Sequence, residues 1–267
     1  MKHSITVGGE ERVIDIRAMD EDFIVFRKMY DPPLTAQNIR TFGPHDDVAQ
    51  LEVIEEFFRK QIRALGSCMI LAWEGDGVIG KMHFTTREMH EALGGPERWN
   101  SSSCYCVDHA GFAPAIKNLS DAELTSLLSS PSRTLCVLCF NVGHSDERYH
   151  GQGIAKAMVR YLKSWARERG WRRIEARSCP DITPTNVIGD WMLRRSPLER
   201  LGFYVLKEMP AFPKEAQARL KVIEELAAGK KELPAWAAWY GRNFSRLHAD
   251  PGWRSEYDKD YLMACDL

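Results

Sequence analysis

Two glycines near the middle of the chain stand where a backbone could hold an anion. The sequence from Arg148 to Ala155 reads RYHGQGIA, so Gly151 and Gly153 flank a single residue. Because glycine lacks a Cβ, a turn built on these residues can present its backbone N–H groups to a ligand at close range. A helix that begins after such a turn points the positive end of its dipole at the same place. The pattern therefore favours a cradle for a ligand with two bridged phosphates.

The segments on either side of this turn must position it. The apolar run TLCVLCFNV at 134–142 predicts a strand that leads into the turn. After the turn, residues 154–169 predict a helix with an apolar stripe and basic residues on its other side. The stripe consists of Ile154, Met158, Leu162, Trp165 and Ala166. Gly170 is suited to end that helix, and 171–177 alternate as a strand does. The unit is strand, glycine turn, helix, strand.

The rest of the chain predicts further elements around this unit. Strands are expected at 13–17, 67–73, 78–84, 203–206 and 261–265, and helices at 23–29, 47–65, 121–128 and 213–228. Two stretches, about 86–132 and 209–259, interrupt this order, and we interpret them as insertions. We expect a single domain over residues 1–267.

Composition restricts the classes of function. The chain has 267 residues and a formal net charge of −1, without the positive excess expected of a nucleic-acid-binding protein. Its beginning has no apolar leader and no later segment could span a bilayer, so we predict a cytoplasmic protein without a membrane partner. Seven cysteines, an odd number, agree with a reducing compartment.

Two pairs of cysteines resemble the ligand pairs of structural zinc. Cys104 and Cys106 are one residue apart, and Cys136 and Cys139 lie inside the predicted strand 134–142. In a regular strand the odd separation of Cys136 and Cys139 would send their side chains to opposite faces. We therefore expect buried thiols and no metal site.

The order of the elements, the segment RYHGQGIA and the later segment PLERLGF at 197–203 resemble the GNAT N-acetyltransferase superfamily. The resemblance runs from about Ile14 to the C-terminus. It implies an α/β fold with a mixed, partly splayed β-sheet flanked by helices, with the insertions between the third and fourth strands and between the last two. In the family, Arg/Gln-x-x-Gly-x-Gly/Ala grips the pyrophosphate of acetyl-CoA, and Arg148, Gly151 and Gly153 match that pattern. The implied cofactor-binding residues are Phe140, Asn141, Val142, Arg148, His150, Gly151, Gln152, Gly153, Ile154 and Ala155.

The resemblance also implies a mechanism, in which the acceptor amine attacks the thioester directly in a ternary complex. That reaction needs backbone N–H groups for the developing oxyanion, expected near 140–142, and a base for an amine that arrives as ammonium. His144 is the first candidate base, followed by Asp146 and Glu147, and the alternative is that this loop is only polar. The arginines at 167, 169, 172 and 173 are either a solvated face or, in part, contacts of the 3′-phosphate of the cofactor.

One departure from the family concerns the leaving thiolate. Many members have a tyrosine four residues before the glycine of the Leu-Gly-Phe corner, and this chain has Leu198 there. Either Ser196 or Tyr204 protonates the thiolate instead, or it leaves unprotonated.

We expect an N-acetyltransferase that transfers an acetyl group from acetyl-CoA to the primary amine of a small molecule. The alternative is a non-catalytic acyl-CoA-binding sensor module with the same fold, which turnover would distinguish. The resemblance leaves a homodimer open. Aromatic residues at 236–244 either line an acceptor pocket or bury the extra helices.

Overall fold

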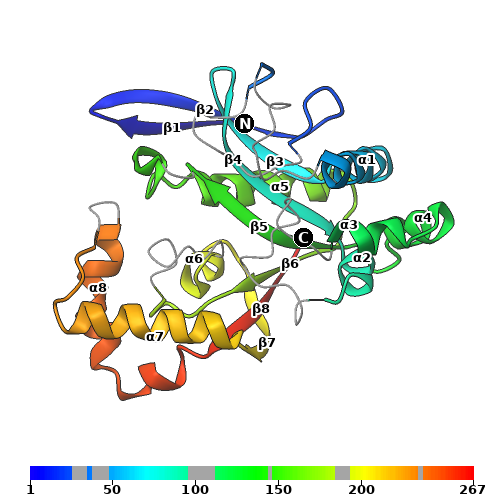
Figure 1. Ribbon diagram of the computed structural model, residues 1–267. Coiled ribbons are helices and arrows are strands. Elements are labelled where there is room, and N and C mark those ends of the chain that lie inside the picture. The colour runs from blue at the N-terminus through cyan, green and yellow to red at the C-terminus, as the bar shows by residue number, and fades with distance from the viewer. Residues whose placement is uncertain (26–34, 38–47, 96–111, 144–145, 184–192, 234–236) are drawn as a thin grey trace.

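The computed structural model describes residues 1–25, 35–37, 48–95, 112–143, 146–183, 193–233 and 237–267. Its described strands form one open sheet in the order β1-β2-β3-β4-β5-β6-β8-β7 (Figure 1). Their bounds are β1 Lys2–Val7, β2 Glu10–Ala18, β3 Met69–Glu74, β4 Gly77–Thr86, β5 Thr134–Val142, β6 Arg173–Ser178, β7 Tyr204–Pro210 and β8 Lys259–Asp266. Strands β5 and β6 pair in parallel, and the other neighbours pair antiparallel. The predicted mixed α/β sheet flanked by helices is confirmed.

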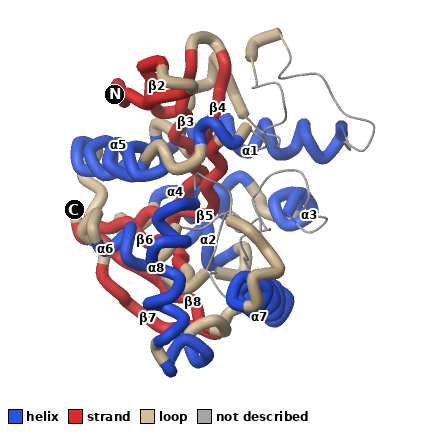
Figure 2. Tube along the Cα trace, turned by 90° about the vertical axis from the view of Figure 1, so that its left-hand side faces the viewer, coloured by secondary structure: helices blue, strands red, loops and turns tan. Residues whose placement is uncertain are grey.

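Helices cover both faces of this sheet. They are α1 Val48–Leu65, α2 Arg87–Ala92, α3 Phe112–Lys117, α4 Asp121–Ser129, α5 Ile154–Glu168, α6 Arg195–Glu199, α7 Pro213–Ala227 and α8 Ala238–Ala249. Figure 2 shows α5 on one side of the strands and α1, α3 and α7 on the other. The predicted stripe of α5 is buried in the core on its own side, and α1 and α4 belong to a second core on the opposite side. The helices α2 to α4 lie between β4 and β5 in the chain, and α7 and α8 between β7 and β8.

The N-terminal strand β1 was missed by the sequence analysis. It forms a hairpin with β2 through Gly8 and Gly9, which both have positive φ, and it buries Ile5 and Val7. A Gly-Gly pair between two alternating segments is a recognised hairpin signal that could have found it. Because of β1, the first long interruption follows the fourth strand of the sheet and not the third.

Two local predictions need correction. Residues 23–25 form no helix, and the remainder of the helix expected at 23–29 lies outside the described residues. The thiols of Cys136 and Cys139 lie on one face of the sheet and not on two, because their partners on β4, Thr85 and His83, are two residues apart. An extra residue in β5 between the two cysteines causes the change.

Candidate functional site

The extra residue in β5 is Leu138, and it marks the point at which β5 leaves β6. On the β4 side, His83 pairs with Cys139 and Phe84 with Val137, so Leu138 is bulged out of the ladder. On the β6 side, the parallel pairing ends at Val137 opposite Ala176, although β5 continues to Val142. Since a bulge bends its strand and increases the local twist, the two observations have one cause. We call the opening between β5 and β6 beyond Leu138 the fork.

The register shows which backbone groups of β5 face the fork. The Gly143 N–H donates to the Ile79 carbonyl at 2.7 Å, so this pair is of the hydrogen-bonded type. Because the two types alternate along an antiparallel ladder, Asn141 directs its backbone groups to Lys81 on β4. Phe140 and Val142 direct theirs away from β4, into the fork. Of the three expected backbone donors, Phe140 and Val142 are therefore suitably placed and Asn141 is not.

The loop after β5 turns sharply at Gly143. This residue has φ +73°, and a Cβ there would lie 2.7 Å from the Asp146 carbonyl oxygen and 3.0 Å from the Cβ of Tyr149. The Asp146 N–H donates back to the Gly143 carbonyl at 2.5 Å. A short 3-10 helix, Glu147–Tyr149, follows, and the His150 ring bonds through Nε2 to the Val142 carbonyl at 3.0 Å. These contacts fold the loop back against the end of β5.

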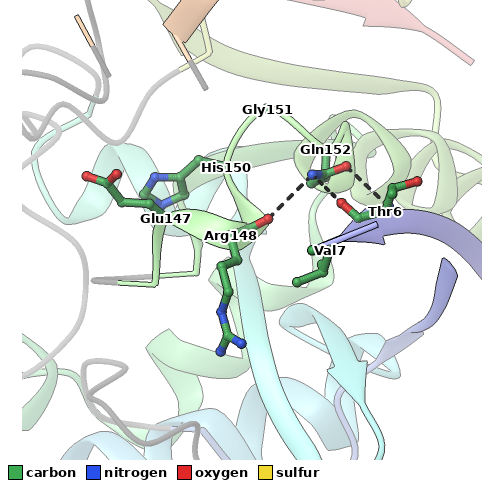
Figure 3. A pocket seen from close by; sticks show the side chains of 8 residues that line it. Thr6, Val7, Glu147, Arg148, His150, Gly151 and Gln152 are labelled. Atoms are coloured by element: carbon green, nitrogen blue, oxygen red, sulfur yellow. Dashed lines mark hydrogen bonds between the residues drawn. The ribbon is translucent and has the colours of Figure 1, made fainter. Parts of the chain in front are cut away.

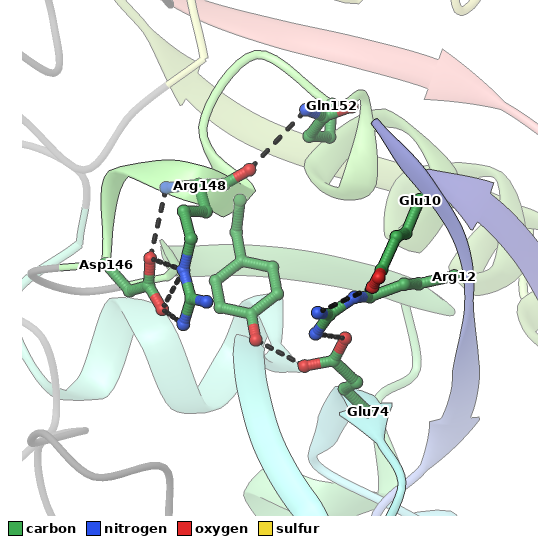
Figure 4. A network of polar contacts seen from close by, with 7 residues as sticks. Glu10, Arg12, Glu74, Asp146, Arg148 and Gln152 are labelled. Carbon is green, nitrogen blue, oxygen red and sulfur yellow. Dashed lines mark hydrogen bonds and ion pairs between the residues drawn. The ribbon is translucent and has the colours of Figure 1, made fainter. Parts of the chain in front are cut away.

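Asp146 and Arg148 form an ion pair on this loop (Figure 4). Arg148 donates from Nε to Oδ1 at 2.8 Å and from Nη2 to Oδ2 at 2.5 Å. Bonding to the Arg148 guanidinium lowers the pKa of Asp146 and raises that of Arg148. A carboxylate with a lowered pKa is a weak proton acceptor, so this ion pair argues against Asp146 as the general base.

Tyr149 anchors the loop to the sheet. Its ring is buried in the core beneath α5, and its hydroxyl donates to Glu74 at the end of β3. Glu74 also accepts from Arg12 Nη1 at 3.0 Å, which links the loop to β2 (Figure 4). Burial, followed by the bond to the Glu74 carboxylate, raises the pKa of Tyr149 to about 12. The motif itself gave no sign of this role, although a tyrosine inside a polar loop suggests an anchored ring.

Strand β1 closes the other side of the glycine turn. The Gln152 side chain donates to the Thr6 carbonyl at 2.8 Å, and His3 Nε2 contacts the Gln152 carbonyl at 3.0 Å. A cleft of about 490 Å³ opens between β1 and the turn. Figure 3 shows the cleft and the bonds of Gln152. It is lined by Thr6, Val7, Gly8, Glu147, Arg148, His150, Gly151 and Gln152.

Helix α5 begins at the glycine turn with a free N-terminal end. Gly151 and Gly153 have φ of +74° and +79°, which favour glycine, and Gly153 is the N-cap without a side-chain hydrogen bond. The first N–H groups of a helix, here from Ile154 onward, have no partner within the helix. The Ile154 side chain is buried in the core and holds the turn in place. The residues present therefore fit a pyrophosphate.

The structure separates the two candidates for protonating a thiolate. Ser196 lies in α6, which is joined to the end of β6 by the Arg195 N–H and the Cys179 carbonyl at 2.9 Å. The Ser196 hydroxyl is buried, and it has no hydrogen-bond partner among the described residues. Tyr204 instead lies at the start of the edge strand β7, 41% exposed, with its hydroxyl bonded to Asp266 at 3.0 Å. The structure brings Ser196 towards the β6 side of the fork and leaves Tyr204 away from it.

Two further residues were expected to act as bases. His144, the first candidate, lies outside the described residues. Glu147 is exposed in the short 3-10 helix and borders the cleft.

Leu198, at the position of the tyrosine found in many family members, is fully buried in the core. It packs the sheet and has no chemical function.

The face of the sheet opposite α5 carries buried polar side chains that the sequence did not reveal. Glu175 on β6 accepts two hydrogen bonds from the Arg87 guanidinium, at the start of α2. Asp260 on β8 accepts from Arg177 on β6 and, at 2.7 Å, from Arg219 on α7. Arg219 and Asp260 are fully buried. Hydrophobic periodicity cannot detect such pairs, because charged residues normally indicate a solvated face.

Two further features, a membrane-spanning helix and a metal-binding cluster, are not found among the described residues. None of the helices they form has the length and apolar character needed to cross a membrane. They also hold no group of three or more histidine, cysteine or acidic side chains placed to bind a metal ion.

The sequence around the glycine turn is similar to that of a known family. The model of the Acetyltransferase (GNAT) family matches residues 144–186. Among solved structures, a polyamine N-acetyltransferase of Drosophila melanogaster is 14% identical, covers 95% of this chain and 100% of its own, and has a TM-score of 0.42. An IAA acetyltransferase of Bacillus cereus is 10% identical, with 95% and 99% coverage and a TM-score of 0.38. A mosquito arylalkylamine N-acetyltransferase-like protein is 10% identical, with 95% and 100% coverage and a TM-score of 0.42.

No curated protein shows a significant match to the chain. The segment matched by the family model includes the glycine turn, all of α5 and all of β6. The resemblance inferred from RYHGQGIA is thus confirmed, and residues 144–186 carry the sequence signature of the GNAT acetyltransferase family.

Proposed function

We propose that this protein is an N-acetyltransferase that transfers the acetyl group of acetyl-CoA to the primary amine of a small molecule. The observation that carries the proposal is the fork at Leu138, which opens directly beside the uncapped N-terminus of α5. A strand whose Phe140 and Val142 N–H groups point away from the neighbouring strand, next to an anion cradle, suits a long ligand that has amide groups along its length and a pyrophosphate at one end. The family match, which includes the glycine turn and α5, supports this assignment.

The backbone supplies most of the binding and polarisation. The N–H groups from Gly151 to Ala155 would hold the pyrophosphate. The fork-facing N–H groups of Phe140 and Val142, with the Phe140 carbonyl, would bond the pantetheine amides and the thioester carbonyl. A preorganised N–H aimed at the developing oxyanion stabilises the transition state more than the ground state. Because these donors belong to a strand and a helix packed in one core, little reorganisation is needed when the acceptor attacks.

Proton transfer requires a base for the ammonium and a donor for the thiolate. The ion pair with Arg148 disfavours Asp146, which leaves His144 and Glu147, directly or through water, as the bases. Ser196 is the donor that the geometry favours, because its buried hydroxyl has no described partner and α6 is joined to the end of β6. A thiolate is a modest base, so we expect this donation to help the reaction without being essential.

The acceptor would approach from the face of the sheet opposite α5, which carries the buried polar residues. Polar groups on that face, such as those of Glu175 and Arg177, can orient an amine and exclude bulk water. Two aromatic side chains of α8, Tyr240 and Phe244, serve a packing role instead. Tyr240 is buried with its hydroxyl bonded to the Ile182 carbonyl at 2.6 Å, and Phe244 packs in the small core beside α7.

The test combines binding with turnover. Calorimetric titration of acetyl-CoA into the protein should show saturable binding that the double variant Gly151→Glu, Gly153→Glu loses, because its carboxylates would repel a pyrophosphate. Circular dichroism of the variant checks that it folds. Release of free CoA thiol is then measured with a panel of small primary amines. Binding without thiol release on any amine would favour the sensor module, and absence of binding to the parent protein would exclude both functions.

A further inference from the structure

A row of basic side chains runs along α5 from the glycine turn towards α6. Lys156, Arg160 and Lys163 are spaced four and three residues apart and therefore lie on one side of the helix. Lys163 Nζ donates to the Leu201 carbonyl at 2.5 Å, so the end of α6 lies against this side. Arg194 and Arg200 flank α6 in the sequence.

The basic side chains at the beginning of this row and beside α6 influence one another. We call Lys156, Arg160, Arg194 and Arg200 the basic seam. Burial, followed by the positive charges of Arg200, Arg160 and Arg194, lowers the pKa of Lys156, in agreement with their positions along α5 and on either side of α6. In the described part of the chain, Lys156, Arg160 and Arg200 form no ion pair. Positive charges that are held close together repel one another in the folded protein. A bound anion would offset this repulsion.

The seam is adjacent to the anion cradle. At about 1.5 Å of rise per residue, the Cα atoms of Lys156 and Arg160 lie roughly 4.5 and 10 Å along the helix from Gly153. Side chains of a helix lean towards its N-terminus, so both extend back in the direction of the turn. A phosphate a few bonds away from a pyrophosphate held at Gly153 is therefore within their reach.

The opposite side of the turn offers no comparable charge. In the cleft beside β1, Arg148 is already paired with Asp146, and the exposed Glu147 adds a negative charge. Of the arginines proposed from the sequence as 3′-phosphate contacts, Arg167 and Arg169 lie at the end of α5, roughly 20 Å or more along the helix axis from Gly153. Arg172 and Arg173 lie beyond that end, where β6 begins. Among them, Arg173 is paired with Asp266 at 2.8 Å, and Arg169 stacks on Trp165 with 4.4 Å between its Cζ and the ring centre.

We propose that the basic seam binds the ribose 3′-phosphate of acetyl-CoA and makes the protein select this cofactor over 3′-dephospho-acetyl-CoA. This inference rests on the proposed function, because it assumes that the glycine turn holds the pyrophosphate. The basic seam then contacts the 3′-phosphate, which is the one group that distinguishes the two cofactors. Its contacts are charge-assisted, and each such bond is stronger than one between neutral groups.

The experiment compares two ligands and three proteins. Acetyl-CoA and 3′-dephospho-acetyl-CoA are each titrated by calorimetry into the parent protein, a Lys156→Gln, Arg200→Gln variant and an Arg167→Gln control. Arg194 is left unchanged because its side chain is half-buried, so its replacement would also disturb packing. Arg167 lies on the last turn of α5, so its removal changes the net charge far from the turn.

For the parent and the control, we expect acetyl-CoA to bind about 10- to 100-fold more tightly than its dephospho form, the range of one or two charged hydrogen bonds. In the seam variant that ratio should fall towards one, mainly through weaker binding of acetyl-CoA. Equal binding of both ligands by the parent protein would overturn the inference and leave the proposed function intact, as would a ratio that the seam variant preserves. Binding of neither ligand would overturn the proposed function, and the inference with it.

Discussion

Replacement of Gly143 by alanine should distort the loop that carries the glycine turn. The residue adopts φ +73°, and the new Cβ would approach the Asp146 carbonyl oxygen to 2.7 Å. Left-handed backbone costs a non-glycine residue about 1–2 kcal/mol, and relief of the contact adds a comparable amount. We therefore expect the free energy of unfolding to fall by about 2–4 kcal/mol. The Asp146 carbonyl accepts from the Tyr149 N–H, so its displacement also moves the anchored ring and the turn behind it.

Urea unfolding followed by circular dichroism measures the stability of the Gly143→Ala variant, and calorimetry measures its affinity for acetyl-CoA. Gly229→Ala is the matched control, because Gly229 has φ +65° but a Cβ added there would have nothing within 4 Å. The control should lose only the backbone term of about 1–2 kcal/mol and bind acetyl-CoA normally. Gly143→Ala should lose more stability and bind at least about tenfold more weakly, equivalent to about 1.4 kcal/mol. Equal losses of stability and unchanged affinity would refute the reasoning.

Three further perturbations test other parts of the structure. Ser196→Ala should lower kcat by about tenfold without changing acetyl-CoA affinity, since removing a proton donor affects the chemical step; an unchanged rate of thiol release would show that the thiolate leaves unaided. Asp260→Asn should reduce the free energy of unfolding in urea by about 3–5 kcal/mol because two buried guanidinium groups lose their charged partner, whereas Glu199→Gln, in an exposed pair with Arg195, should cost less than about 1 kcal/mol. Similar losses for both would contradict this account. Burial, followed by the charge of Arg177, lowers the pKa of His90 to about 4. Between about pH 6.5 and 4 the unfolded chain therefore binds a proton that the folded protein does not, and stability should decrease by up to about 3 kcal/mol as the pH falls through this window. The His90→Gln variant should lack this component in pH-dependent unfolding, and an identical slope in both proteins would exclude His90 as its source.

The central unit could be predicted from the sequence because its signals are local. The apolar stripe of α5, the strand at 134–142 and the two glycines each depend on neighbours within a few residues. Periodicity reports directly on burial in such segments. The proposed anion cradle rests on the same residues, because the geometry of a glycine turn and of a helix N-terminus depends on no distant partner.

The rest depends on contacts between distant segments. The anchoring of Tyr149 requires Glu74, the clamp on Gln152 requires β1, and the Arg219–Asp260 pair joins α7 to β8. Nothing in the local sequence distinguishes Ser196 from Tyr204 as a proton donor, because their difference lies in which strand each packs against. The bulge at Leu138 was missed for a related reason: it is defined by the register of the neighbouring strand.

The short parallel ladder between β5 and β6 divides the sheet into two halves that are joined by few backbone hydrogen bonds. Only the pairs from Thr134 opposite Arg173 to Val137 opposite Ala176 join β1–β5 to the strands β6, β8 and β7. Every other pairing of neighbouring strands among the described residues lies within one of these two halves. A ligand seated in the fork would contact both sides and act as a splint across the division. If the proposed cofactor occupies the fork, the stiffness of the sheet would therefore differ between the free and the bound protein, and the bulged residue Leu138 would be the origin of that difference.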